Sequence, residues 1–378
     1  MKFRTVSRVL QHRNRSPSIQ LHTYRLVAHL HSAPKRPSFG IAFDIDGVIL
    51  RGRSPIGDSP KALKRLYDDD SGSLKIPYLF LTNGGGIPES RRASELSQLL
   101  GVDIDPIQVV QGHSPFKNLL TRFENELVVA TGKGEPAAVM SEYGFKKAVS
   151  LDEYASYFDS IDPLAPYKMW TTKQPCNKQR NLSFDVTSER VKAAFVVSDP
   201  VDWSRDIQVL CDILRSGGLP GEKSEHQPDM YFAADDLEYQ AVFPSERLGM
   251  GAFRIALESI FNSIHHKPLK YTSFGKPNPF VFKNAESVLM QLQSLTSDAD
   301  LNGDYKDKKS HHFETLYMIG DNPSVDIKGA RQAGHPWFSI LTRTGVFRGK
   351  ENHSDYPADQ VVVTVEEAVE FILQREFA

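Results

Sequence analysis

The sequence has few cysteines and no long apolar run. Its two cysteines, Cys176 and Cys211, provide neither a disulfide framework nor a metal-ligand spacing. Both are expected to be reduced packing residues, which suits a reducing compartment. The apolar runs fall well short of the roughly 18 residues that a membrane-spanning helix needs, and no internal repeat is visible. These absences exclude a disulfide-stabilised secreted scaffold and predict that the chain has no transmembrane segment.

Acidic residues are absent from the first 40 positions, which carry eight Lys or Arg side chains. An Arg-rich, Ser-containing leader without acids is typical of a mitochondrial transit peptide. We therefore expect residues 1–37 to direct import into mitochondria, with the matrix as destination, and to be disordered or cleaved. A basic tail that binds nucleic acid or membrane is the alternative. The rest of the chain has 37 basic and 47 acidic residues, a formal charge of −10, so nucleic acid is not expected as the main partner.

Short apolar runs alternate with helical patterns along the chain, whose 378 residues are enough for two domains. Continuous apolar runs occur at 41–43, 78–81 and 316–319, and such runs suit strands that are buried on both faces. A helix is predicted to begin at a Ser59 N-cap, and another covers 89–100. This alternation predicts an α/β fold with a doubly wound parallel sheet.

Residues 115–268 contain a second α/β pattern. Strands are expected at 127–130 and 193–197, and helices at 207–214 and 252–260. We expect this region to be a domain inserted into the first. The predicted organisation is a leader at 1–37, a first core segment at 38–114, an inserted domain at 115–268 and a second core segment at 269–378.

Four short segments carry side chains suited to phosphate chemistry. These side chains are Asp44 and Asp46, Thr82 and Asn83, Lys276, and Asp321 with Asp326. Three of the segments are apolar strand patterns that end in these residues, and ligands of parallel sheets bind beyond the carboxyl ends of strands. Clustered carboxylates require a cation, and hard oxygen ligands suit Mg²⁺. A carboxylate nucleophile, a metal, a lysine and a hydroxyl together predict a phosphoryl-transfer site.

The four segments resemble, in order and spacing, the motifs of the haloacid dehalogenase (HAD) superfamily. The long insertion between the threonine and lysine motifs resembles that of subfamily IIA. Leu-Thr-Asn-Gly-Gly-Gly at 81–86, Gly-Met-Gly-Ala-Phe-Arg at 249–254 and Gly-Asp-Asn-Pro-Ser-Val-Asp-Ile at 320–327 are similar to the mitochondrial cat eye syndrome critical region protein family and its fungal relatives. The resemblance covers residues 38–375 and implies a HAD core with an inserted α/β cap domain of the C2 type.

The resemblance also implies the catalytic roles of the acids. Asp44 is expected to attack phosphorus and to become an aspartyl phosphate. Asp46 is expected to protonate the leaving oxygen and then to deprotonate the attacking water. Mg²⁺ is expected to bind Asp321, the Asp44 carboxylate and the Asp46 backbone carbonyl. Asp326 is expected to lie behind these ligands, where it steadies the metal or the lysine.

The phosphoryl group is expected to contact the remaining motif residues. Thr82, Asn83 and Gly84 are predicted to bind it, and Lys276 to offset its charge. Glycine at position 84 allows a close approach of the backbone, with N–H groups turned toward a phosphate.

These features predict a Mg²⁺-dependent phosphatase that hydrolyses a small phosphorylated metabolite in mitochondria. The resemblance adds a link to glycerophospholipid metabolism, because fungal relatives occur fused to phosphatidyl-transferring enzymes. Two alternatives stay open, namely a catalytically idle HAD fold that acts as a binding or scaffold protein, and a phosphotransferase. A homodimer is open as well. The segment at 232–237 departs from the Asn-Pro-Asp run of many subfamily IIA relatives, so their substrates do not transfer to this chain.

Overall fold

The computed structural model describes residues 37–168, 183–222, 224, 226–295 and 313–378. Two compact units, Met1–Lys35 and Arg36–Ala378, divide the chain, and all described residues belong to the second unit. Cys176 and, apart from Pro37, the predicted leader lie outside the described residues.

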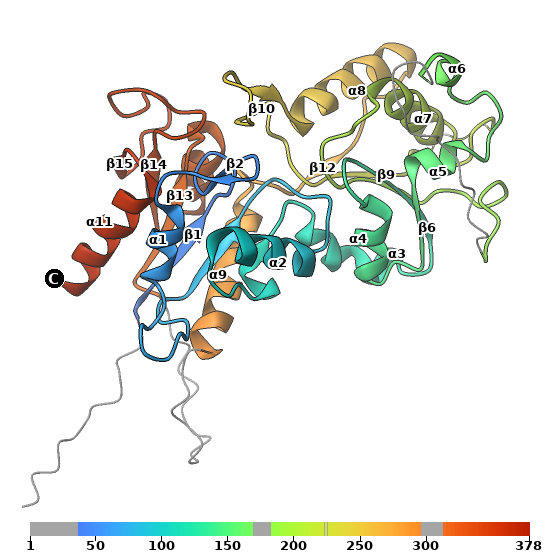
Figure 1. The fold of residues 1–378 in the computed structure, drawn as a ribbon. Coiled ribbons are helices and arrows are strands. Elements are labelled where there is room, and N and C mark those ends of the chain that lie inside the picture. Colours follow the sequence, from blue (N-terminus) through green and yellow to red (C-terminus); the bar gives the residue numbers. More distant parts are fainter. Residues whose placement is uncertain (1–36, 169–182, 223, 225, 296–312) are drawn as a thin grey trace, which may run out of the picture. The chain divides into compact units, whose positions relative to one another are not determined.

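A six-stranded parallel sheet forms the first half of the architecture, with the strand order β15-β14-β13-β1-β4-β5. Its strands β1, β13, β14 and β15 are labelled in Figure 1. Its strands are β1 (Phe39–Phe43), β4 (Tyr78–Leu81), β5 (Val109–Val110), β13 (Thr315–Gly320), β14 (Trp337–Thr342) and β15 (Gln360–Val362). The three apolar runs at 41–43, 78–81 and 316–319 all lie within these strands, as predicted. They occupy the neighbouring strands β1, β4 and β13 at the middle of the sheet.

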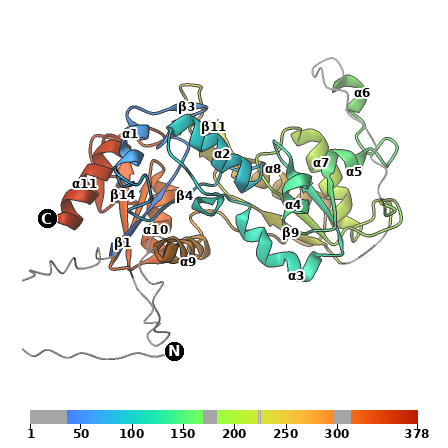
Figure 2. The same ribbon diagram turned by 60° about the horizontal axis from the view of Figure 1, so that its bottom comes forward.

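Helices cover both faces of this sheet (Figure 2). Ile41 and Phe43 of β1 pack with side chains of three helices, and the intervening Ala42 packs with side chains of two others. The first group is α1 (Ser59–Lys64), α2 (Glu89–Leu100) and α11 (Val365–Phe377), and the second is α9 (Pro279–Leu295) and α10 (Lys328–Ala333). The prediction of a doubly wound parallel sheet is therefore confirmed.

A second parallel sheet has the strand order β12-β9-β8-β6-β7. Its strands are β6 (Leu127–Thr131), β7 (Lys147–Ser150), β8 (Ala193–Val196), β9 (Asp229–Phe232) and β12 (Thr272–Ser273). Its helices are α3 (Leu120–Phe123), α4 (Pro136–Glu142), α5 (Leu151–Ala155), α6 (Ala165–Lys168), α7 (Trp203–Arg215) and α8 (Met250–Ile264). The helices α7 and α8 pack together, with the rings of Trp203 and Phe253 in edge contact at 5.4 Å. The predicted domain boundaries stay a prediction.

Two short hairpins complete the strands. They are β2 (Leu50–Arg51) with β3 (Ser54–Pro55), and β10 (Glu238–Tyr239) with β11 (Arg247–Leu248).

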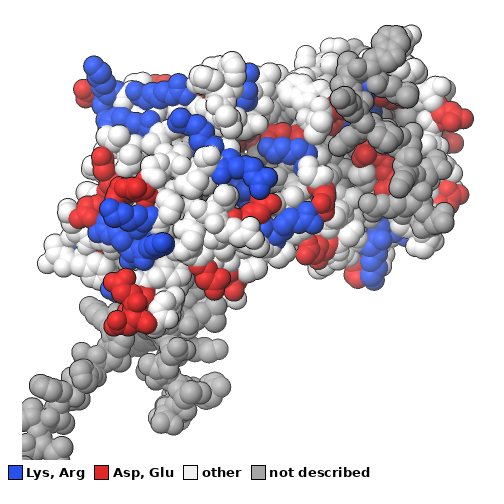
Figure 3. Space-filling view, viewed as in Figure 1, with Lys and Arg blue, Asp and Glu red and all other residues white. Residues whose placement is uncertain are grey.

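On the face drawn in Figure 3, Lys and Arg side chains lie among Asp and Glu side chains. Within the described residues, no helix combines the length and the apolar character that are needed to cross a membrane.

The first helix begins one residue differently from the prediction. Asp58 is at the N-cap of α1, and Ser59 is already helical and buried. The Ser59 hydroxyl donates a hydrogen bond to the Ile49 carbonyl at 3.0 Å. A tertiary contact therefore takes the hydroxyl that would otherwise cap the helix.

Candidate active site

One cavity brings together the side chains that the sequence predicts to be functional. It has a volume of about 60 Å³, and its walls come from both sheets. Its lining includes every predicted site residue, namely Asp44, Asp46, Thr82, Asn83, Gly84, Lys276, Asp321 and Asp326.

The strand order explains this convergence. Strands β13, β1 and β4 are adjacent, and Asp321, Asp44 and Thr82 are the first residues after their carboxyl ends. Parallel strands end at the same edge of a sheet, so these side chains meet there. Lys276 comes from elsewhere, because it follows β12 of the second sheet.

Lys276 pairs with two acids in the cavity. Its buried ammonium nitrogen lies 2.7 Å from Asp44 Oδ1 and 2.7 Å from Asp326 Oδ1. Burial alone would lower the pKa of Lys276, but the two carboxylates raise it overall, so the lysine stays charged. The second oxygen of Asp326 accepts a hydrogen bond from the backbone N–H of Asn322 at 3.0 Å. Both oxygens of Asp326 are therefore held by protein donors.

Asp44, Asp321 and Asp326 form a buried carboxylate cluster. One oxygen of each lies within 4.8 Å of the others. Burial raises the pKa of Asp44 despite the nearby Lys276, and burial with the neighbouring Asp326 raises the pKa of Asp321 to about 7. The Val346 amide donates to Asp321 Oδ2 at 2.6 Å. A cluster of hard oxygen atoms fits a divalent cation such as Mg²⁺, which removes their mutual repulsion.

Asp46 differs from these acids because its carboxylate has no hydrogen-bond partner among the described residues, although it lines the same cavity. Burial raises the pKa of Asp46, while Arg92 and Lys133 oppose this shift. Gly47 has a φ of +90°, and a Cβ atom there would lie 2.5 Å from Asp321 Oδ2. The turn that carries Asp46 past Asp321 therefore requires glycine.

Thr82 and Asn83, which follow β4, make different contacts with their side chains. The Gly84 amide donates to Thr82 Oγ1 at 3.0 Å, so the hydroxyl keeps its own proton as a donor. The Asn83 side chain instead contacts the backbone of Lys276, donating to its carbonyl at 2.9 Å and accepting from its amide at 2.8 Å. Contact of these residues with a phosphoryl group stays a prediction.

Loops of the second sheet add residues that the sequence did not predict as part of the site. Lys133, after β6, lies 2.8 Å from Asp199, after β8, and its ammonium lies 5.3 Å from the centre of the Tyr239 ring. Asp236, after β9, also lines the cavity, and burial raises its pKa to about 7. The glycines on both sides of Lys133 are a local signal in the sequence, and Asp236 lies in the segment at 232–237 that replaces the Asn-Pro-Asp run of relatives. Asp199 and Tyr239 have no such signal.

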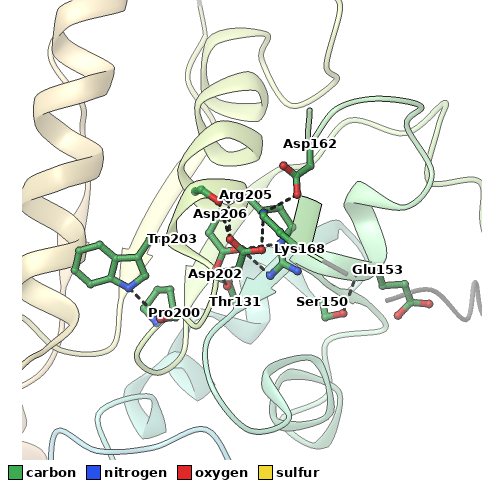
Figure 4. A network of polar contacts seen from close by, with 11 residues as sticks. Thr131, Ser150, Glu153, Asp162, Lys168, Pro200, Asp202, Trp203, Arg205 and Asp206 are labelled. Atoms are coloured by element: carbon green, nitrogen blue, oxygen red, sulfur yellow. Dashed lines mark hydrogen bonds and ion pairs between the residues drawn. The ribbon is translucent and has the colours of Figure 1, made fainter. Parts of the chain in front are cut away.

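A second cavity, of about 910 Å³, is lined by the loop after β6, and Lys133 lines both cavities. Four of its charged side chains form two ion pairs with one another (Figure 4). Lys168 donates to Asp202 at 2.6 Å, and the Arg205 guanidinium donates to the buried Asp206 at 2.8 and 2.9 Å. Asp202 and Asp206 of this cavity are therefore each paired with a basic side chain.

Comparisons with known proteins identify the family. The haloacid dehalogenase-like hydrolase family matches residues 41–146, and the HAD-hydrolase-like family matches residues 273–368. A mitochondrial hydrolase of Saccharomyces cerevisiae is 32% identical over 348 residues, which cover 88% of this chain and 95% of the yeast protein. A cardiolipin synthase (CMP-forming)/mitochondrial hydrolase fusion protein of Schizosaccharomyces pombe is 32% identical over 352 residues, which cover 91% of this chain and 55% of the fusion protein.

The same fold occurs in solved structures. A glycerol phosphate phosphatase from Mycobacterium tuberculosis, in complex with magnesium, has a TM-score of 0.55 at 16% identity, over 88% of this chain and 76% of that one. The chain thus has the fold of a HAD enzyme, with a HAD core and an inserted α/β cap, as the motifs predict. It belongs to the haloacid dehalogenase-like hydrolase family. We refer to the second sheet and its helices as the cap; of its strands, all but β12 lie within the predicted insertion at 115–268.

Proposed function

We propose that this protein is a Mg²⁺-dependent phosphatase that hydrolyses a small phosphate monoester. The observation that carries the proposal is the pairing of Asp44 with Lys276 beside Asp321, in one cavity with the Asp46 carboxylate, which no described residue hydrogen-bonds. A nucleophile, an acid–base group and a cation are the minimum for two-step hydrolysis.

In the first step, a carboxylate oxygen of Asp44 attacks phosphorus in line with the leaving group. The P–O bond to the leaving group breaks as the Asp44–phosphorus bond forms. Asp46 donates a proton to the departing oxygen, and its raised pKa favours the protonated form that this step needs. The products of the step are a free alcohol and an aspartyl phosphate.

In the second step, Asp46 is a carboxylate and accepts a proton from water. The water oxygen attacks phosphorus, and the bond between phosphorus and Asp44 breaks. Inorganic phosphate leaves, and both acids return to their initial states. Because Asp46 has no competing partner among the described residues, it is available for both proton transfers.

Three further groups stabilise negative charge on the phosphoryl oxygens. The Thr82 hydroxyl donates a hydrogen bond, and the Lys276 ammonium offsets charge. Asp44 and Asp321, with the backbone carbonyl of Asp46, would hold Mg²⁺, which when bound supplies positive charge beside the phosphoryl group. Asp326 holds Lys276 in place through the contact of 2.7 Å.

The substrate that we propose is a soluble glycerol or sugar phosphate. The small volume of the cavity, about 60 Å³, suits a phosphoryl group with a compact leaving group. The names of the fission yeast fusion protein and the mycobacterial phosphatase support a link to glycerophospholipid metabolism.

The names of both yeast relatives and the acid-free leader support a mitochondrial location. A reporter fused to residues 1–45 that stays in the cytosol would refute this location.

The test is phosphate release from a panel of monoesters by the purified protein, with Mg²⁺ and with EDTA. We expect release from glycerol or sugar phosphates that depends on Mg²⁺. Vesicles containing phosphatidylglycerol phosphate serve as the membrane-embedded alternative. Release only from the vesicles would overturn the proposed substrate, and no release from any ester would overturn the phosphatase.

A further inference from the structure

Asp236, in the cap, forms a hydrogen bond with Asn83, in the core. The Asn83 amide nitrogen donates to Asp236 Oδ1 at 2.7 Å, although 153 residues separate the two. Within the described part of the chain, Asn83 is the side chain that hydrogen-bonds the Asp236 carboxylate. This contact joins the loop after β4 of the first sheet to the loop after β9 of the second.

Asn83 in turn holds the backbone of Lys276. Its two side-chain N–H groups go to Asp236 and to the Lys276 carbonyl, and its oxygen accepts the Lys276 amide. With both donors used, the orientation of the Asn83 amide is fixed. The lysine held in this way is the one whose ammonium contacts Asp44 at 2.7 Å.

The turn that carries Asp236 is built by the Gly-Met-Gly-Ala-Phe-Arg segment at 249–254. The Gly251 amide donates to the Asp236 carbonyl at 2.8 Å, and Arg254 Nε donates to Asp235 Oδ1 at 2.5 Å. A Cβ atom on Gly251 would lie 2.4 Å from the Asp235 carbonyl oxygen, so only glycine permits this approach. The N-terminal end of α8 therefore fixes where Asp236 points.

We propose that Asp236 is a positioning residue of the reaction, which acts through Asn83 to place Lys276 against Asp44. This inference rests on the proposed phosphatase activity. It makes the cap part of the catalytic machinery, in addition to any contact that the cap has with the leaving group. A misplaced Lys276 stabilises the transition state less, so kcat falls while KM changes little.

Substitutions at Asp236 separate this role from a general structural one. Asp236→Ala removes the acceptor and leaves a buried N–H of Asn83 unpaired. We expect kcat to fall about tenfold or more, which corresponds to about 1.4 kcal/mol, with KM within about threefold. Asp236→Asn retains a carbonyl oxygen at the same place, and we expect it to restore most of kcat. Asp229→Ala removes an acid from the opposite end of β9, beside Arg122, and should leave kcat unchanged.

A double-mutant cycle with Asn83→Ala is the decisive measurement. If Asp236 acts through Asn83, the double variant has the kcat of Asn83→Ala alone. If the two losses multiply, or if Asp236→Asn is as impaired as Asp236→Ala, the inference is wrong while the phosphatase stands. A wild-type protein that releases no phosphate overturns the proposed function and this inference with it.

Discussion

Lys276 Nζ and Asp44 Oδ1 lie 2.7 Å apart, although the two residues are 232 positions apart in the chain and follow strands of different sheets. The contact places the positively charged ammonium of Lys276 beside Asp44, the proposed nucleophile. It also opposes the effect of burial, which raises the pKa of Asp44. The lysine therefore favours the ionised carboxylate that an attack on phosphorus needs.

Asp44→Asn should abolish turnover and leave the fold intact. The change keeps the shape of the side chain but replaces the nucleophilic carboxylate with an amide. Phosphate release should fall below a few per cent of wild type, and the melting temperature should not fall. Retention of substantial activity would contradict the assignment of Asp44 as nucleophile.

Lys276→Met should lower both activity and stability. It leaves Asp44 and Asp326 buried without their cation, and breaking a buried ion pair in this way costs about 3–5 kcal/mol. Urea unfolding measures the change in the free energy of unfolding. Lys61→Met is the control, because Lys61 pairs with Glu366 at an exposed site, where a loss of less than about 1 kcal/mol is expected. Equal losses of unfolding free energy in the two variants would show that the buried Lys276 pairs stabilise the fold no more than the exposed Lys61 pair.

Mg²⁺ should raise the melting temperature of the protein, because the carboxylate cluster that we propose as its site exists only in the folded state. At a concentration of 100 times Kd the gain is about 2.7 kcal/mol. Asp321→Asn should remove most of this gain, since it removes one carboxylate from the cluster. Asp58→Asn, at the N-cap of α1, should retain it. A Mg²⁺-induced shift of wild-type size in Asp321→Asn would place the metal elsewhere.

Stability should fall between pH 6.5 and pH 4 because of His113. Burial lowers the pKa of this histidine to about 4, and its Nδ1 lies 2.7 Å from the Tyr143 hydroxyl. The unfolded chain, with an ordinary histidine pKa of about 6.5, binds more protons in this range, so the free energy of unfolding rises with pH. The expected loss at pH 5 is about 2 kcal/mol relative to pH 7.5. Urea unfolding at both values should show a smaller difference in His113→Gln, and an unchanged difference would contradict the prediction.

The sequence predicts the centre of the fold better than its periphery. β1, β4 and β13 are continuous apolar runs because helices cover both faces of their sheet, and this pattern is visible locally. β5 and β12 have two residues each, too few for any periodicity. The core motifs follow the predictable strands, so their convergence could be inferred. The resemblance singles out the segment at 232–237 but assigns no role to Asp236, because only the pairing of two distant loops brings it to Asn83.

The pairing of β12 with β9 has a consequence for the independence of the two halves. β12 lies three residues before Lys276 and is hydrogen-bonded to a strand of the cap. Excision of the insertion would therefore remove the partner strand of the segment that delivers the lysine to Asp44. The six-stranded sheet therefore does not hold Lys276 in place without the insertion. A chain trimmed to this sheet should lose the fixed position of Lys276 as well as the domain that covers the site.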